Sequence, residues 1–159
     1  MGVMRSLLLA TIGAAALAAC GGADPTFEPE GRLCDAETRA DVFRVGLEAP
    51  SAEAMYTLVL EDSLVEGQFG PPDRGMNTWT VGLVDGSGAA MTGAEVQLKP
   101  WMPDHGHGTS PELHYGRPVA GGYELGPFNL HMGGYWEFRF TVTASSASDT
   151  AQLGFCVEG

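Results

Sequence analysis

The chain has 159 residues, 44% of them hydrophobic, and a formal net charge of −12 at pH 7. This length suffices for one domain with a buried core, and the acidic balance argues against nucleic acid and anionic lipid as partners because both would repel the protein. The sequence also lacks a nucleophile elbow, a phosphate loop, a His-Glu-x-x-His motif and a dinucleotide fingerprint, so we expect no enzyme activity.

Residues 1–19 have the features of a lipoprotein export signal. Arg5 supplies a positive charge, and the apolar run from Leu7 to Ala19 is too short to span a bilayer as a stable helix. The sequence Leu17-Ala18-Ala19-Cys20 resembles the lipobox of bacterial lipoproteins, in which the cysteine is acylated and becomes the mature N-terminus. The alternative is an ordinary cleaved signal in which Cys20 has no role.

The residues after Cys20 predict where and how the protein is anchored. Gly21, rather than Asp, follows Cys20, and by resemblance to Gram-negative lipoproteins this favours the periplasmic face of the outer membrane, if the source is Gram-negative. Residues 20–31 are rich in Gly, Pro and acidic residues, which predicts a flexible tether. Without residues 1–19 the chain keeps seven basic and twenty acidic residues, a net charge of −13, which favours solubility and attracts cations.

Two cysteines remain once Cys20 is assigned to the lipid. Cys34 and Cys156 stand near the two ends of the domain expected over residues 32–159, and an even number of cysteines in an oxidising compartment predicts a disulfide. In the chain-entropy model, a disulfide that closes such a long loop adds roughly 4–5 kcal/mol to the free energy of unfolding. A thiol metal site is the weaker alternative, because neither cysteine has a second Cys or His nearby in the sequence.

Residues 32–159 are expected to form a single all-β domain, in which only Asp35–Val42 could be a short helix. The clearest strand is Trp136–Val142, because apolar and polar residues alternate along it. Turn signals at Asp85–Gly88, Gly121-Gly122 and Gly133-Gly134 separate the strands. About seven short strands predict an immunoglobulin-like β-sandwich. The candidates in chain order are Phe43–Leu47, Tyr56–Glu61, Trp79–Leu83, Ala94–Leu98, Tyr123–Leu125, Trp136–Val142 and Leu153–Val157.

The segment Lys99–Gly108, with the sequence Lys-Pro-Trp-Met-Pro-Asp-His-Gly-His-Gly, carries the most specific chemistry. It supplies the thioether of Met102 and the imidazoles of His105 and His107, and the pair His131-Met132 follows 24 residues after His107. Thioether with imidazole is the ligand set that suits copper, above all Cu(I). Alternate residues of an extended segment point the same way, so His105 and His107 can converge on one ion, with Met102 as the best local third ligand.

The strand pattern also predicts where this site lies. If the strand over residues 94–98 keeps its alternation, Met102 falls on the inward side, and the histidines lie on a loop at one end of the sandwich. In a regular strand only one of His131 and Met132 could face the ion, but the turn at Gly133-Gly134 could let both approach. His114 is a spare donor, and Asp104 is the only nearby carboxylate of the kind that zinc prefers.

The alternative interpretation needs no metal. Met102 and Met132 would then fill the end of the core, and His105 and His107 would form hydrogen bonds to the backbone of a glycine-rich turn.

The order of short motifs resembles the YtkA-like (FixH-like) domain of bacterial envelope proteins, roughly from Asn77 to Val142. The resemblance implies an immunoglobulin-like sandwich and a role near cytochrome oxidase assembly and copper handling. Two features depart from the pattern: Tyr135 is an extra spacer before the tryptophan, and Asp104-His105 stands where many members have apolar residues. The motifs are Gly75-Met76-Asn77, Gly93-Ala94-Glu95-Val96, Met102–Gly108, Gly122-Tyr123 and Met132-Gly133-Gly134-Tyr135-Trp136.

Two function hypotheses follow from the sequence. The first is a copper-binding or copper-delivering lipoprotein, held at the membrane by lipid on Cys20, with metal ligands drawn from Met102, His105, His107, His131 and Met132. The second is a metal-free interaction module that docks an envelope protein through the sandwich edge or the loop 101–121.

Overall fold

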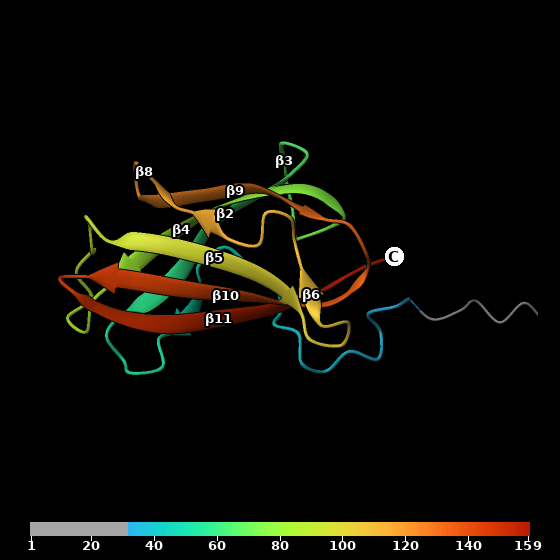
Figure 1. The fold of residues 1–159 in the computed structure, drawn as a ribbon, viewed down its shortest axis with the longest axis horizontal. Helices are drawn as coiled ribbons and strands as arrows, with labels where there is room; N and C mark the ends of the chain where they lie inside the picture. Colours follow the sequence, from blue (N-terminus) through green and yellow to red (C-terminus); the bar gives the residue numbers. More distant parts are fainter. Residues whose placement is uncertain (1–31) are drawn as a thin grey trace, which may run out of the picture. The chain divides into compact units, whose positions relative to one another are not determined.

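The computed structural model describes residues 32–159, so the signal, Cys20 and the tether lie outside the described residues. Seven strands have four residues or more: β1 (Leu47–Pro50), β2 (Thr57–Val65), β4 (Gly75–Val84), β5 (Glu95–Met102), β9 (Gly122–Leu130), β10 (Gly134–Ala144) and β11 (Ala147–Val157) (Figure 1). Four further strands have two or three residues: β3 (Gln68–Phe69), β6 (His107–Gly108), β7 (His114–Tyr115) and β8 (Arg117–Val119).

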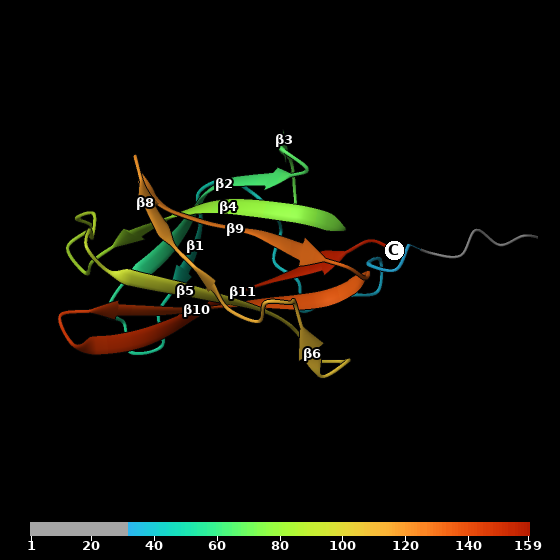
Figure 2. The same ribbon diagram turned by 45° about the horizontal axis from the view of Figure 1, so that its top comes forward.

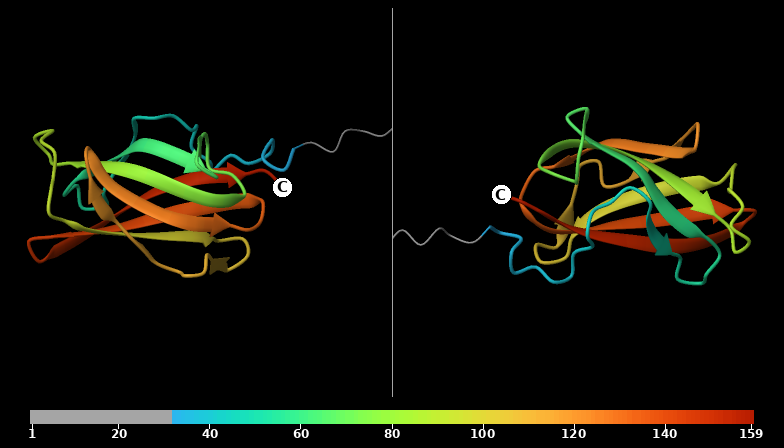
Figure 3. Two further views of the ribbon diagram at one scale, coloured as in Figure 1. Left: turned by 90° about the horizontal axis from the view of Figure 1, so that it is seen from above. Right: turned by 180° about the vertical axis from the view of Figure 1, so that it is seen from behind.

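These strands form two antiparallel sheets. One sheet has the order β1-β2-β4-β9-β8, with β3 paired to β2, and the other has the order β11-β10-β5-β6, with β7 paired to β5. The sheets form two layers with the core between them (Figures 2 and 3). The predicted all-β sandwich is therefore confirmed, and the seven longer strands match the predicted number.

Alternation along the strands builds the core. Trp79 is completely buried, and its ring centre lies 4.3 Å from that of Phe138 and 5.7 Å from those of Phe128 and Phe155. In β5 the inward positions are those that the sequence predicts, so Met102, the last residue of the strand, is 1% exposed. The predicted alternation of Trp136–Val142 likewise lies within β10.

Two expectations for the start of the domain are wrong. Asp35–Val42 is not a helix: its first residues form a turn, in which Glu37 N donates to Cys34 O at 3.1 Å, and the described residues include no helix. The strand expected at Phe43–Leu47 begins only at Leu47, because a turn closed by a hydrogen bond from Leu47 N to Arg44 O (3.2 Å) precedes it. Tertiary contacts decide the conformation of this segment.

The predicted disulfide is confirmed and fixes the first described residues to β11. The Cα atoms of Cys34 and Cys156 are 5.6 Å apart, within the range that a disulfide spans. Asp41 adds two hydrogen bonds, from its N to Gly154 O (2.7 Å) and from Gly154 N to its Oδ2 (2.8 Å). The start of the domain, β6 and the C-terminus therefore lie at the same end of the molecule (Figures 1 and 2).

A buried carboxylate organises the opposite connection, between β1 and β2. Asp149 is 4% exposed and accepts hydrogen bonds from Glu53 N (3.1 Å), Met55 N (3.3 Å) and Thr150 N (2.7 Å). Burial alone would raise the pKa of Asp149, but hydrogen bonds from the Ser51 side chain and the three amides outweigh it and hold this pKa below its usual range. The ionised form of Asp149 therefore favours the folded state.

We expect Asp149→Asn to lower the melting temperature at pH 7 by several degrees, because an amide cannot accept all of these hydrogen bonds without turning an N–H group toward a donor. Since folding lowers the pKa of Asp149, its contribution is complete at neutral pH and is lost as the pH falls below about 4. Thermal unfolding at pH 7 and pH 3 should therefore show a smaller difference between the variant and the wild type at pH 3. The exposed Glu48→Gln variant is the control, and equal melting temperatures at pH 7 would contradict the prediction.

Candidate functional site

The hairpin between β5 and β6 places Met102 and His107 directly opposite each other. The two residues are register partners, and partners across an antiparallel pair have side chains on the same face. The turn is closed by hydrogen bonds to Met102 O from His105 N (3.3 Å) and Gly106 N (2.9 Å). Gly106 has a φ of +69°, a conformation that glycine adopts without strain. His105 therefore lies in a tight turn and His107 at the start of β6, rather than both along one extended strand.

A third imidazole comes from the connection between β9 and β10. The ring centres of His107 and His131 are 5.3 Å apart, and those of His105 and His107 are 5.7 Å apart. The buried indole of Trp136 lies beside this group, with its centre 5.9 Å from that of His131 and 6.5 Å from that of His107. We call His105, His107 and His131 the histidine cluster.

The two methionines near this cluster differ in their surroundings. Met102 is buried, and a Cβ atom placed on Gly134 would come within 2.8 Å of its terminal methyl group, so a larger residue at position 134 would displace the end of the Met102 side chain. Met132 is partly buried against the hydrophobic core, and its carbonyl oxygen accepts a hydrogen bond from Trp136 Nε1 at 3.1 Å. Of the pair His131-Met132, the structure brings the imidazole to His107 and packs Met132 against the core.

The two other candidate metal ligands that the sequence offered, Asp104 and His114, already contact other side chains. Asp104 pairs with Arg39 through two hydrogen bonds of 2.9 and 2.6 Å, and these bonds lower the pKa of Asp104. His114 is buried opposite Leu98, and its Nε2 lies 3.0 Å from Thr109 Oγ1. Burial lowers the pKa of His114, which favours its neutral form. Neither residue belongs to the histidine cluster.

The spacing of the imidazoles can be compared with that in a metal site. An imidazole bound at about 2.0–2.1 Å has its ring centre about 3 Å from the ion, so two rings on one ion have centres about 5–6 Å apart. The separations of 5.3 and 5.7 Å fall in that range. Within residues 32–159, however, no three His, Cys, Asp or Glu side chains are grouped closely enough to hold a metal ion. A metal site here thus needs a thioether as a ligand or a rotation of the side chains.

Arg39 is a residue near this site that sequence reasoning missed. It contacts Asp104, which is 65 residues away in the chain, and its guanidinium carbon lies 4.2 Å from the centre of the Tyr135 ring. No local pattern signals such a pair. The only sequence signal is the unusual polar residue Asp104 within the Met-Pro-x-x-Gly-His-Gly pattern.

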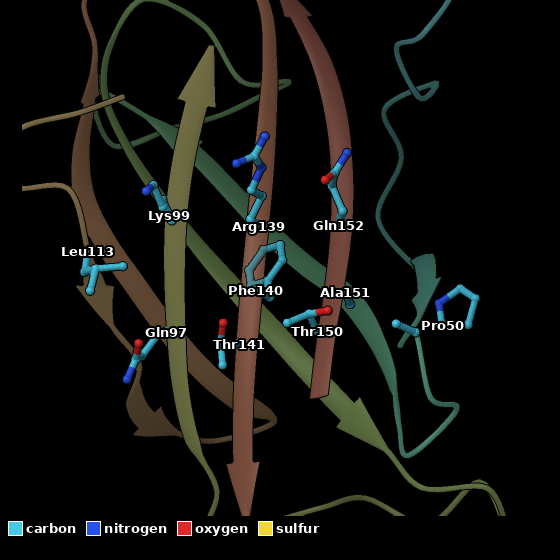
Figure 4. Close-up of a pocket in the computed structure, with 11 residues that line it drawn as sticks. Pro50, Gln97, Lys99, Leu113, Arg139, Phe140, Thr141, Thr150, Ala151 and Gln152 are labelled. Carbon is cyan, nitrogen blue, oxygen red and sulfur yellow. The ribbon is translucent and has the colours of Figure 1, made fainter. Parts of the chain in front are cut away.

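A concave surface away from the histidine cluster lies on the outer face of the sheet formed by β5, β10 and β11. It is a groove of about 560 Å³ with Leu113 on one side and Pro50 on the other (Figure 4). Both cationic side chains that line the groove are paired, Lys99 with Glu112 and Arg139 with Glu137. The floor consists of two cross-strand rows of polar side chains, Lys99, Arg139 and Gln152 in one and Gln97, Thr141 and Thr150 in the other.

The fold defines a single all-β sandwich domain, with the histidine cluster at the end where its first described residues and its C-terminus meet. Residues 58–141 match the family model described as YtkA-like, which covers 84 of the 159 residues. The chain therefore belongs to the YtkA-like family, a membership that indicates an envelope-associated β domain. Searches of curated proteins and of solved structures found no match. Among the described residues, no helix is long and apolar enough to cross a membrane.

Proposed function

We propose that this protein is a non-enzymatic, membrane-anchored copper protein that binds one Cu(I) ion through Met102, His107 and His131. The anchor is lipid on Cys20, and the location is the periplasmic face of the outer membrane. These two parts of the proposal rest on the sequence of residues 1–21. The role of the protein is to hold copper or to deliver it.

The observation that carries the proposal is the approach of His107 in β6 and His131 in the β9–β10 connection, with the buried Met102 opposite His107 in the hairpin register. Their ring centres are 5.3 Å apart, and Met102 is the register partner of His107. Two imidazoles and one thioether form a mixed set that favours Cu(I) over Zn(II), because zinc gains little from a thioether. Because Met102 supplies the third ligand, this set needs no third His, Cys, Asp or Glu side chain.

The remaining residues of the sequence-based ligand set take supporting roles. His105 is exposed, with its ring centre 5.7 Å from that of His107, so it can receive an incoming ion and pass it to His107. Met132 supports Trp136 through its carbonyl oxygen and packs against the core. The acidic surface raises the local concentration of cations around the site.

Titration with Cu(I) in competition with a chelator tests the proposal. The Cys20→Ser protein is used because a free thiol at position 20 would itself bind Cu(I). Ascorbate is the reductant because it leaves the Cys34–Cys156 disulfide intact. We expect each chain to bind one Cu(I) ion with a Kd below about 1 μM. Because Trp136 lies beside His107 and His131, binding should also quench its fluorescence, and Trp136→Phe should remove that signal.

Met102→Leu isolates the contribution of sulfur. This substitution nearly conserves volume, so the fold should remain, while Cu(I) affinity should fall by about tenfold or more. Met76→Leu is the matched control, because Met76 is 47% exposed and lies on β4. A wild-type Kd above about 1 μM would contradict the proposed ligand set, and so would equal Cu(I) affinities in Met102→Leu and Met76→Leu.

The polar groove favours a second candidate function. If the protein binds no copper, a metal-free interaction module that docks an envelope protein is the better interpretation, and the groove lined by Lys99, Arg139 and Gln152 is the surface to test. If the folded protein contains the histidine cluster but shows no affinity for copper, that result favours the metal-free interaction module.

A further inference from the structure

One guanidinium contacts both the hairpin that carries His105 and His107 and the start of β10, which follows His131 in the chain. Arg39 Nη1 donates to Asp104 Oδ1 at 2.9 Å, and Nη2 donates to Asp104 Oδ2 at 2.6 Å. The same guanidinium lies over the ring of Tyr135, 4.2 Å from its centre. Asp104 directly precedes His105 in the hairpin, and Tyr135 directly precedes Trp136 in β10. Arg39 therefore links the hairpin to the start of β10.

Arg39 is itself fixed in place rather than carried on a free segment. Glu37 accepts hydrogen bonds from Arg39 Nε (2.9 Å), Nη2 (2.6 Å) and the backbone N (2.7 Å). These bonds lower the pKa of Glu37 to about 2, so it is ionised at neutral pH. On either side, the Cys34–Cys156 disulfide and the hydrogen bonds between Asp41 and Gly154 tie the segment to β11.

The contacts require the shape of an arginine and not only its charge. Two N–H groups meet the two oxygens of Asp104, while the guanidinium lies over the Tyr135 ring. A lysine would keep the charge but would lose both features. The side chains of Arg39 and Asp104 are 45% and 53% exposed, so solvent screens their attraction, and the main effect of the pair is geometric.

We propose that Arg39 is a positioning residue for the copper site: it holds the Pro103–Gly106 turn against the start of β10, so that His107 and His131 stay within reach of one ion. The copper part of this inference rests on the proposed function. The clamp itself is a property of the metal-free protein and can be measured without copper.

The test compares Arg39→Lys with wild type in the Cys20→Ser background. We expect Cu(I) affinity to fall about fivefold, which corresponds to about 1 kcal/mol, while the melting temperature changes little. In the metal-free protein, the amides of His105 and Gly106, which both donate to Met102 O, should exchange with deuterium faster. The matched control is Arg117→Lys, because Arg117 pairs with Glu124 on the edge of the other sheet.

Two further results separate the clamp from the copper function. If wild type binds Cu(I) but Arg39→Lys changes neither the affinity nor the amide exchange, the role of Arg39 is wrong and the proposed function stands. If wild type binds no Cu(I), the proposed function fails, and the exchange rates alone decide whether Arg39 holds the turn.

Discussion

Replacing Cys34 and Cys156 by serine should lower the free energy of unfolding by roughly 4–5 kcal/mol. The two cysteines are 122 residues apart, and cross-linking a chain over about 100 residues or more removes this much conformational freedom from the unfolded state. A loss of this size is a large fraction of the stability of a domain, which is typically about 5–15 kcal/mol. Denaturant unfolding of the purified variant and wild type measures the difference directly.

Reduction of the wild type provides the control for the disulfide prediction. Wild-type protein treated with a strong reductant should unfold at the same denaturant concentration as the Cys34→Ser, Cys156→Ser variant, and the variant itself should not respond to the reductant. The hydrogen bonds between Asp41 and Gly154 remain in both proteins, so the folded start of the domain should still lie against β11. A loss below about 1 kcal/mol would show that the unfolded chain gains little freedom when the bridge is absent.

Replacing His107 and His131 together by alanine should abolish Cu(I) binding, with at least about a hundredfold loss of affinity. The two imidazoles are the pair with the closest ring centres in the cluster, and removing both leaves the buried thioether of Met102 without a nitrogen partner opposite it. The fold should remain, because His131 is exposed and His107 is only partly buried. The competition titration, together with thermal unfolding, tests both statements.

His105→Ala is the matched comparison for the double variant. His105 is exposed in the same hairpin, and it is not among the proposed ligands, so its loss should weaken binding by less than about tenfold and mainly slow the uptake of the ion. If His105→Ala instead removes binding while the double variant keeps it, the ion is held by the turn alone. The pairing of His107 with His131 would then have no part in copper binding.

Local sequence patterns predicted much of the fold and the position of the site. The alternation through residues 94–98 predicted the inward side of Met102, which is 1% exposed at the end of β5. The alternation of Trp136–Val142 marked the centre of β10. Short strands such as β6 and β7, of two residues each, have no period of their own, so nothing in the sequence indicated them.

The arrangement of the candidate ligands was less predictable. The spacing of His105 and His107 suggested that the two point the same way, but that argument assumes an extended segment. The segment is instead a hairpin turn around Gly106, and the register of β5 with β6 places His107 opposite Met102. Register depends on how two strands meet, so spacing within one segment cannot supply it.

The sequence by itself determined the all-β class, the disulfide and the inward position of Met102, because each follows from local periodicity or from there being two cysteines within residues 32–159. Only the tertiary structure decided that His107 meets His131, that Asp104 is engaged by Arg39, and that His114 pairs with Thr109 in a buried setting. The first two of these contacts join parts of the chain that are 24 and 65 residues apart, and the third depends on how the loop packs against β5. The first two contacts form only once the domain has folded and brought distant segments together, so no single segment encodes them.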